Sequence, residues 1–194
     1  MTYFLGLTSG QMAVLNAIAI LGHVSTFGVV PFLLDGKEKR RMAMAAMVVN
    51  ILVNNVPILL RLAGLMPGNG ASTLAGILYF QGMLQMTMGP LVGILIASML
   101  AEIVEAHAVD TGQHVAGMIS AAQSFSYKVT GALGTAMAGF GLDVIQFPTG
   151  AVSTDVPAGV IFRFGVFYGP VCMVFSVLSM LMLFFYRISR ADHE

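Results

Sequence analysis

Long apolar stretches separated by short polar breaks run along this chain. A helix that crosses the hydrocarbon core of a bilayer needs about 20 predominantly apolar residues, and five stretches of the sequence are long enough. They cover residues 11–34, 42–65, 73–101, 114–141 and 158–186. The pattern predicts an all-α integral membrane protein with five transmembrane helices.

The segments between these stretches have the composition of turns and exposed loops. Residues 35–41 form a charged break, and residues 67–70 read Pro-Gly-Asn-Gly. Residues 102–113 are polar and are predicted to be a loop, as are residues 147–157, which are rich in Pro, Gly, Ser and Thr. No soluble domain is evident, so residues 1–194 are expected to form one helical bundle.

Lysine and arginine are distributed unevenly between the two sides of this predicted topology. One side carries Lys37, Lys39, Arg40, Arg41, Arg187 and Arg190. The opposite side has Arg61 and Arg163, both near the ends of predicted helices. Because short cytoplasmic loops are enriched in basic residues, we expect the N-terminus outside and the C-terminus in the cytoplasm.

Composition agrees with a membrane protein and argues against several function classes. Hydrophobic residues make up 57% of the chain and charged residues only 9%, whereas soluble domains average roughly 25% charged residues. The formal net charge is zero, so nothing indicates a nucleic-acid partner. The sequence contains no nucleophile elbow, no P-loop and no metal-ligand spacing. An enzyme is therefore not expected.

Lys128 lies in the middle of the fourth apolar stretch. A cation at that depth costs at least ~2.5–3.5 kcal/mol, so it usually faces a protein interior and a partner. No acidic residue lies in the middle of any predicted span, and a partner would have to come from elsewhere. Two interpretations stay open: Lys128 lies on a substrate or ion path, or it pairs with a carboxylate to stabilise packing.

Other polar residues of the fourth stretch recur at helical spacing around Lys128 and share one face of the predicted helix. The residues on this face are Ser120, Ser124, Tyr127, Lys128, Gly131 and Thr135, with Gln123 beside them. In the third stretch Gln81 and Gln85 share a face, and their amides suit a hydroxyl-rich solute because each offers a donor and an acceptor. Bonding between helices is the alternative for these amides.

Two further sets of polar residues allow alternative interpretations. In the second stretch Asn50, Asn54 and Arg61 form a stripe, which favours hydrogen bonds between helices, with Arg61 extending to the outer interface. Glu102 and Glu105 follow the third stretch on the cytoplasmic side. They are either part of a solvated loop or part of a gate whose carboxylates pair with cations of another domain.

The junction and the fourth stretch together resemble a known family. Residues 101–107, Ala-Glu-Ile-Val-Glu-Ala-His, followed by Thr111 and Gly112, resemble a junction of the glycoside–pentoside–hexuronide:cation symporters, a branch of the major facilitator superfamily that includes the melibiose carriers. Residues 117–139, with Gln123, Ser124 and Lys128, are similar to the eleventh helix of that family.

This resemblance implies a specific architecture and function. The five spans would be helices eight to twelve of a twelve-helix carrier, forming a partial C-terminal bundle whose partner is an N-terminal half, covalent or separate. Such carriers couple solute uptake to Na⁺ or H⁺ by alternating access, with no other cofactor. Lys128 would lie beside the cation and sugar sites, and Gln123 and Ser124 toward the sugar.

Together the residues and the resemblance lead to one hypothesis and one alternative. The hypothesis is part of a cation-coupled symporter for a small solute such as a sugar or glycoside, in the bacterial cytoplasmic membrane. Its path would be lined by Lys128, Gln123, Ser124, Tyr127 and Gln85. The alternative is a five-helix membrane protein that does not transport but binds or regulates a partner, or a truncated remnant.

Overall fold

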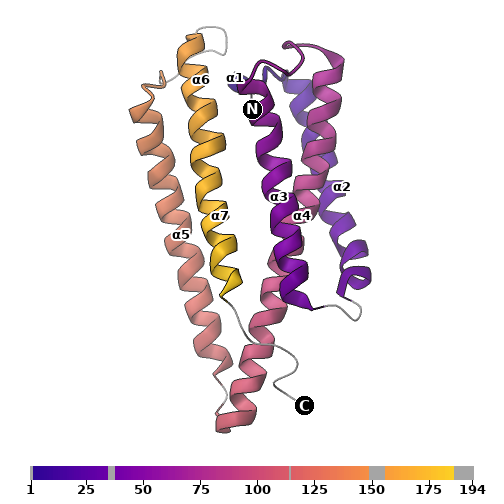
Figure 1. Cartoon of the computed structure of the whole chain (residues 1–194), viewed down its shortest axis with the longest axis vertical. Helices are drawn as coiled ribbons and strands as arrows, with labels where there is room; N and C mark the ends of the chain where they lie inside the picture. Colours follow the sequence, from indigo (N-terminus) through magenta and orange to yellow (C-terminus); the bar gives the residue numbers. More distant parts are fainter. Residues whose placement is uncertain (1, 35–37, 114, 149–155, 186–194) are drawn as a thin grey trace.

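The computed structural model describes residues 2–34, 38–113, 115–148 and 156–185. Within these ranges the regular elements are all helices, with no strand. In chain order they are α1 (Thr2–Leu5), α2 (Ser9–Leu34), α3 (Lys39–Leu62), α4 (Ser72–Thr111), α5 (Ala116–Val144), α6 (Ala158–Val166), the π-helix η1 (Phe167–Val171) and α7 (Cys172–Phe184). The long helices run roughly along one common direction (Figure 1), which confirms the predicted all-α class.

Among the described residues, four stretches of helix have the length and hydropathy of a membrane span: Ser9–Phe32, Lys39–Leu62, Ser72–Thr111 and Ala158–Phe184. The fifth long helix, α5, has 29 residues, or about 44 Å, which is also long enough to cross a bilayer. Its Gly, Ser, Tyr and Lys residues make it less apolar than the other four. The described part of the chain thus has four strongly apolar helices and one more polar one, which is the composition of an integral membrane protein.

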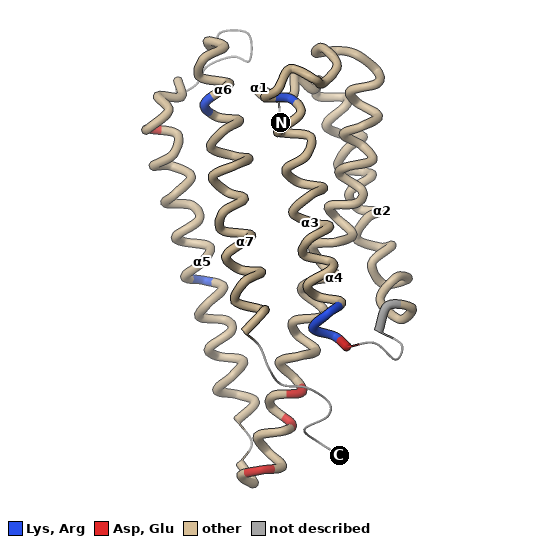
Figure 2. Tube along the Cα trace, viewed as in Figure 1, with Lys and Arg blue, Asp and Glu red and all other residues tan. Residues whose placement is uncertain are grey.

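Helix α4 extends beyond its predicted span, and the prediction of a loop at residues 102–113 is wrong. The helix has 40 residues and ends at Thr111, so at about 60 Å it is about twice as long as the hydrocarbon core is thick. Gly112, at φ +67°, ends the helix by donating its N–H to the Ala108 carbonyl. Figure 2 shows acidic residues along this protruding end of α4. Ala and Glu are strong helix formers, so the helix continues through these charged residues.

Helices α2 and α3 both pack along α4, which is therefore the central helix of this group (Figure 1). Two apolar clusters hold the group together, one toward each end of the helices. The first contains Phe4, Leu5, Leu7, Leu15, Ile58, Leu74 and Leu78. The second contains Ala43, Ala46, Leu91, Leu95 and Met99. Without water between lipid-facing helices, close packing of this kind is the main source of helix association.

A buried group of hydroxyls joins α2 to α4 between these clusters. Thr26 Oγ1 donates to the Thr87 carbonyl at 3.1 Å, and the Ser25 and Thr87 hydroxyls lie 2.9 Å apart. Thr87 Oγ1 also lies 3.1 Å from the Gly22 carbonyl oxygen. A Cβ on Gly22 would lie 2.7 Å from the Met83 carbonyl oxygen, so the absence of a side chain at Gly22 is what allows the two backbones to approach.

The last predicted span consists of α6, η1 and α7 in succession, with Pro170 inside the π-helical turn. Helix α7 and η1 pack against α3. Gly169 of η1 lies against Ile58, because a Cβ at Gly169 would be 2.7 Å from Ile58 Cγ2. Pro lacks a backbone N–H and distorts the preceding turn, and π-turns occur frequently at functional sites.

Helix α5 lies beside α6 and α7 and is exposed over most of its length (Figure 1). Near its C-terminal end the Phe167 ring covers Gly141, which is buried. An apolar cavity of about 690 Å³ lies between α5 and the segment formed by α6, η1 and α7. One side of α5 thus faces these neighbours, and the rest of its surface is uncovered.

Candidate functional site

The predicted path residues of the fourth span lie on α5, and most are exposed. Ser124, Tyr127 and Lys128 have exposed side chains, whereas Gln123 is half-buried and its Nε2 donates to Tyr127 Oη at 3.4 Å. Among the described residues Lys128 makes no ion pair and no hydrogen bond. The structure therefore brings Gln123 and Tyr127 together and leaves the ammonium group without a partner.

Lys128 and the packed side of α5 lie on different faces of the helix. Gly134 and Met137 line the cavity beside α6 and α7. Successive residues of an α-helix are about 100° apart, so Lys128 lies roughly 120° around the helix from Gly134 and about 180° from Met137. The ammonium group therefore points away from α6 and α7. Lys128 lies near the middle of the 29 residues of α5.

Gln85 and Gln81 lie one turn apart on α4 but have different surroundings. Gln85 is half-buried, and no hydrogen bond joins it to the polar face of α5 within the described ranges. Gln81 is buried, with 8% of its surface exposed. It lines a cavity of about 100 Å³ together with Asn54 and Tyr168. Sequence spacing placed the two glutamines on one face but did not indicate that only Gln81 lines this cavity.

Glu102 makes an ion pair within the chain. Its Oε1 lies 2.6 Å from Lys39 Nζ, and Lys39 also donates to Ser98 Oγ at 2.6 Å. The pair joins the first residue of α3 to the emerging part of α4, with 20% of the Lys39 side chain and 38% of the Glu102 side chain exposed. Glu105 lies on the same helix, is exposed, and has no ion pair in the described part of the chain. Of the two predicted gating acids, Glu105 is thus the one that is free to pair with another cation.

The residue after Lys39 makes a second contact that the sequence did not predict. Arg40 Nη2 donates to the Phe184 carbonyl at 2.5 Å, and its guanidinium lies 5.5 Å from the centre of the Phe184 ring. Lys39 and Arg40 therefore connect the start of α3 to α4 and to the end of α7. The basic run at 37–41 was the signal for these residues, and it was interpreted only as a sign of orientation. Of the residues used for that argument, Lys37, Arg187 and Arg190 lie outside the described residues.

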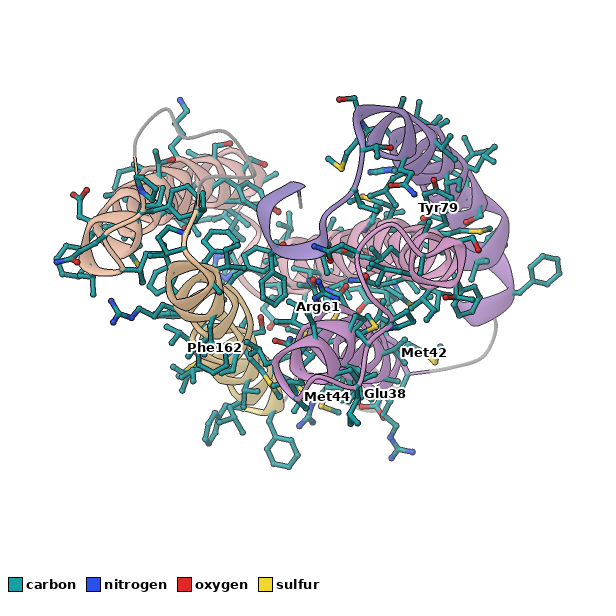
Figure 3. The ribbon with its side chains drawn as sticks, turned by 90° about the horizontal axis from the view of Figure 1, so that it is seen from above. Glu38, Met42, Met44, Arg61, Tyr79 and Phe162 are labelled. Atoms are coloured by element: carbon teal, nitrogen blue, oxygen red, sulfur yellow. The ribbon has the colours of Figure 1, made fainter. Side chains whose placement is uncertain are left out.

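The residues of the stripe on α3 have different surroundings. Within the described ranges neither Asn50 nor Asn54 makes a hydrogen bond to another helix, so the predicted bonding between helices is not confirmed. Arg61 lies at the end of α3, where it donates to the Pro67 carbonyl at 2.9 Å and to Asn69 Oδ1. Figure 3, seen from above, shows Arg61 and Phe162 on neighbouring helices, α3 and α6, and both line a cavity of about 210 Å³.

In the described ranges, no group of three or more His, Cys, Asp and Glu side chains is placed to hold a metal ion. The amides and hydroxyls of the helices can orient and bind a neutral solute, because each offers a donor and an acceptor.

Comparison with known proteins agrees with this interpretation. No curated protein and no solved structure matches the chain. The family described as MFS/sugar transport protein matches residues 1–190, which is nearly the whole chain. This match shows that the chain belongs to the MFS/sugar transport protein family and so to the major facilitator superfamily.

Proposed function

We propose that the chain forms part of a cation-coupled secondary transporter for a small solute such as a sugar or glycoside, working by alternating access. The observation that carries this proposal is the uncovered polar face of α5 with Lys128 at its centre. Together with membership of a sugar transport family, an unpaired charge in a membrane helix supports a path for a polar solute.

The polar face of α5 needs a partner from another set of helices. An unpaired lysine at mid-membrane depth costs at least ~2.5–3.5 kcal/mol, and a carboxylate from outside the described residues would remove most of this cost. We propose that the partner belongs to the N-terminal half of the carrier, covalent or separate. Na⁺ or H⁺ would then compete with Lys128 for that carboxylate, which gives a physical basis for coupling.

The neutral side chains around Lys128 define the class of solute. Gln123, Ser124 and Tyr127 provide amide and hydroxyl groups that both donate and accept hydrogen bonds. Gln85 on α4 would complete this path once the two halves come together. The arrangement suits a solute with many hydroxyl groups better than a strongly charged one.

The proposed orientation puts the start of α3 and the protruding end of α4 in the cytoplasm of a bacterial cell, with the N-terminus outside. Glu102 would hold α3 and α4 together through Lys39. Glu105, which is exposed, would pair with a cation of the other half when the cytoplasmic side closes. In this gate Glu102 would stabilise the packing of its own half, and Glu105 would contact the other half.

Exchange of Lys128 in the complete carrier tests this proposal. In proteoliposomes Lys128→Ala should abolish accumulation driven by a cation gradient. Without the lysine ammonium group nothing competes with Na⁺ or H⁺ for the carboxylate, so binding of the coupling ion is no longer linked to transport. Ser126→Ala is the matched control on the same helix, since Ser126 Oγ bonds only to the Ala122 carbonyl of its own turn. Full gradient-driven uptake by Lys128→Ala would refute the proposal. Absence of flux through the unmodified carrier would favour a regulatory protein or a remnant.

A further inference from the structure

A small cavity lies between α1, α3, α4 and the α6–η1 segment, and no residue of α5 lines it. Its volume is about 100 Å³. Phe4 and Leu5 of the short helix α1 close one end, and both side chains are buried. Asn54 of α3 and Gln81 of α4 supply its amide groups.

Gln81 is the main reason to regard this cavity as a binding site. The residue is more than nine-tenths buried, with 8% exposed, and in the described part of the chain its amide has no hydrogen-bond partner. Asn54 is half-buried and has no such partner there either. Buried amides in native proteins are almost always hydrogen-bonded, to protein, water or ligand. These two amides line the same space, so one guest could satisfy both.

The opposite wall of the cavity is aromatic and rigid. Phe164 and Tyr168 stack with their ring centres 6.0 Å apart and their planes at 3°. Tyr168 belongs to the π-helical turn η1, and the close packing of Gly169 on Ile58 holds this turn against α3. Pockets with apolar walls and a few convergent polar groups are the usual form of small-molecule sites.

Size and charge limit what the cavity can hold. One water needs roughly 10–15 Å³ of such space, and a cavity of about 150 Å³ accommodates a six-membered carbon ring. A volume of about 100 Å³ therefore takes several waters or one molecule of about glycerol size. None of the residues lining the cavity carries a charge, so no opposite charge would offset the cost of removing an ion from water.

We propose that this cavity binds a small neutral molecule with hydroxyl or amide groups, of about the size of glycerol. Its polar edge would bond to the Gln81 and Asn54 amides, and its carbon side would lie on Phe164 and Tyr168. This site is separate from the path on α5, and its existence does not depend on whether the chain transports.

A single-tryptophan variant makes the cavity observable. The chain contains no Trp, and Tyr168 is 43% exposed, so Tyr168→Trp adds a unique fluorophore at the cavity wall with room for the larger ring. Glycerol added to this variant of the full chain in nanodiscs should change the emission saturably. Sucrose at matched viscosity is too large for the cavity and should cause no saturable change. Lactate, which is similar in size but charged, should also cause none.

Two substitutions in the Tyr168→Trp variant, Gln81→Leu and Gln85→Leu, test where glycerol binds. Gln81→Leu replaces the buried amide with an apolar side chain of similar size, so the fold should persist. It should weaken glycerol binding by about tenfold or more, because one buried hydrogen bond is lost. A response to glycerol that does not saturate, or that equals the sucrose response, would mean that the cavity holds only water. A response abolished by Gln85→Leu and kept by Gln81→Leu would also overturn the proposal, because the ligand would then lie on the predicted path.

Discussion

The contact between α2 and α4 should depend on the missing side chain of Gly22. In Gly22→Ala the new Cβ would lie 2.7 Å from the Met83 carbonyl oxygen and 3.0 Å from Met86 Cβ. The backbone of α4 cannot move aside locally, so the helices must separate and weaken the Thr26–Thr87 hydrogen bond. Overpacking of this kind costs about 1–3 kcal/mol. The higher helix propensity of Ala returns at most about 1 kcal/mol, so we expect a net loss of about 1–2 kcal/mol.

Gly28→Ala is the matched control on the same helix. Nothing lies within 4 Å of a Cβ at Gly28, so this substitution should be neutral or slightly stabilising. The assay is equilibrium unfolding of the purified full chain in mixed micelles with an increasing fraction of denaturing detergent, followed by circular dichroism. Equal unfolding free energies for the two variants would refute the reasoning, because α2 and α4 would then not be in close contact at Gly22.

Two further stability predictions concern specific polar contacts. Thr87→Val keeps the shape of the side chain but removes the hydroxyl that contacts Gly22 and Ser25. The same unfolding assay should show a loss of about 0.5–1.5 kcal/mol in unfolding free energy. An unchanged unfolding free energy would mean that these hydrogen bonds do not stabilise the contact between α2 and α4. For the ion pair between α3 and α4, a double-mutant cycle of Lys39→Met and Glu102→Gln should give a coupling of about 0.5–1 kcal/mol that decreases in high salt, because the pair is partly exposed. Lys39→Met should cost more than Glu102→Gln, since Lys39 also donates to Ser98, and the opposite order would contradict this geometry.

The positions of the long helices could be predicted from the order of residues alone. Span length and apolarity are local properties, because the bilayer imposes a fixed thickness on every segment that crosses it. The predicted start of α6 at Ala158 agrees with the structure, as does the separation of α2 from α3. The end of α4 was missed because the charges at Glu102 and Glu105 were interpreted as a loop, although Ala and Glu are strong helix formers. Charge predicts exposure to water and carries no information on whether the helix continues.

Some features of the candidate sites follow from local sequence, and others depend on contacts between residues far apart in the chain. Helical periodicity was sufficient to gather Ser124, Tyr127 and Lys128 on one face of α5, since residues three or four apart share a face. The pairing of Lys39 with Glu102 was not predictable, because these residues lie 63 positions apart and meet only when α3 packs along α4. The same packing places Gln81, and not Gln85, in a cavity with Asn54. Periodicity specifies the face on which a side chain lies, whereas the packing of helices distant in sequence specifies what that face meets.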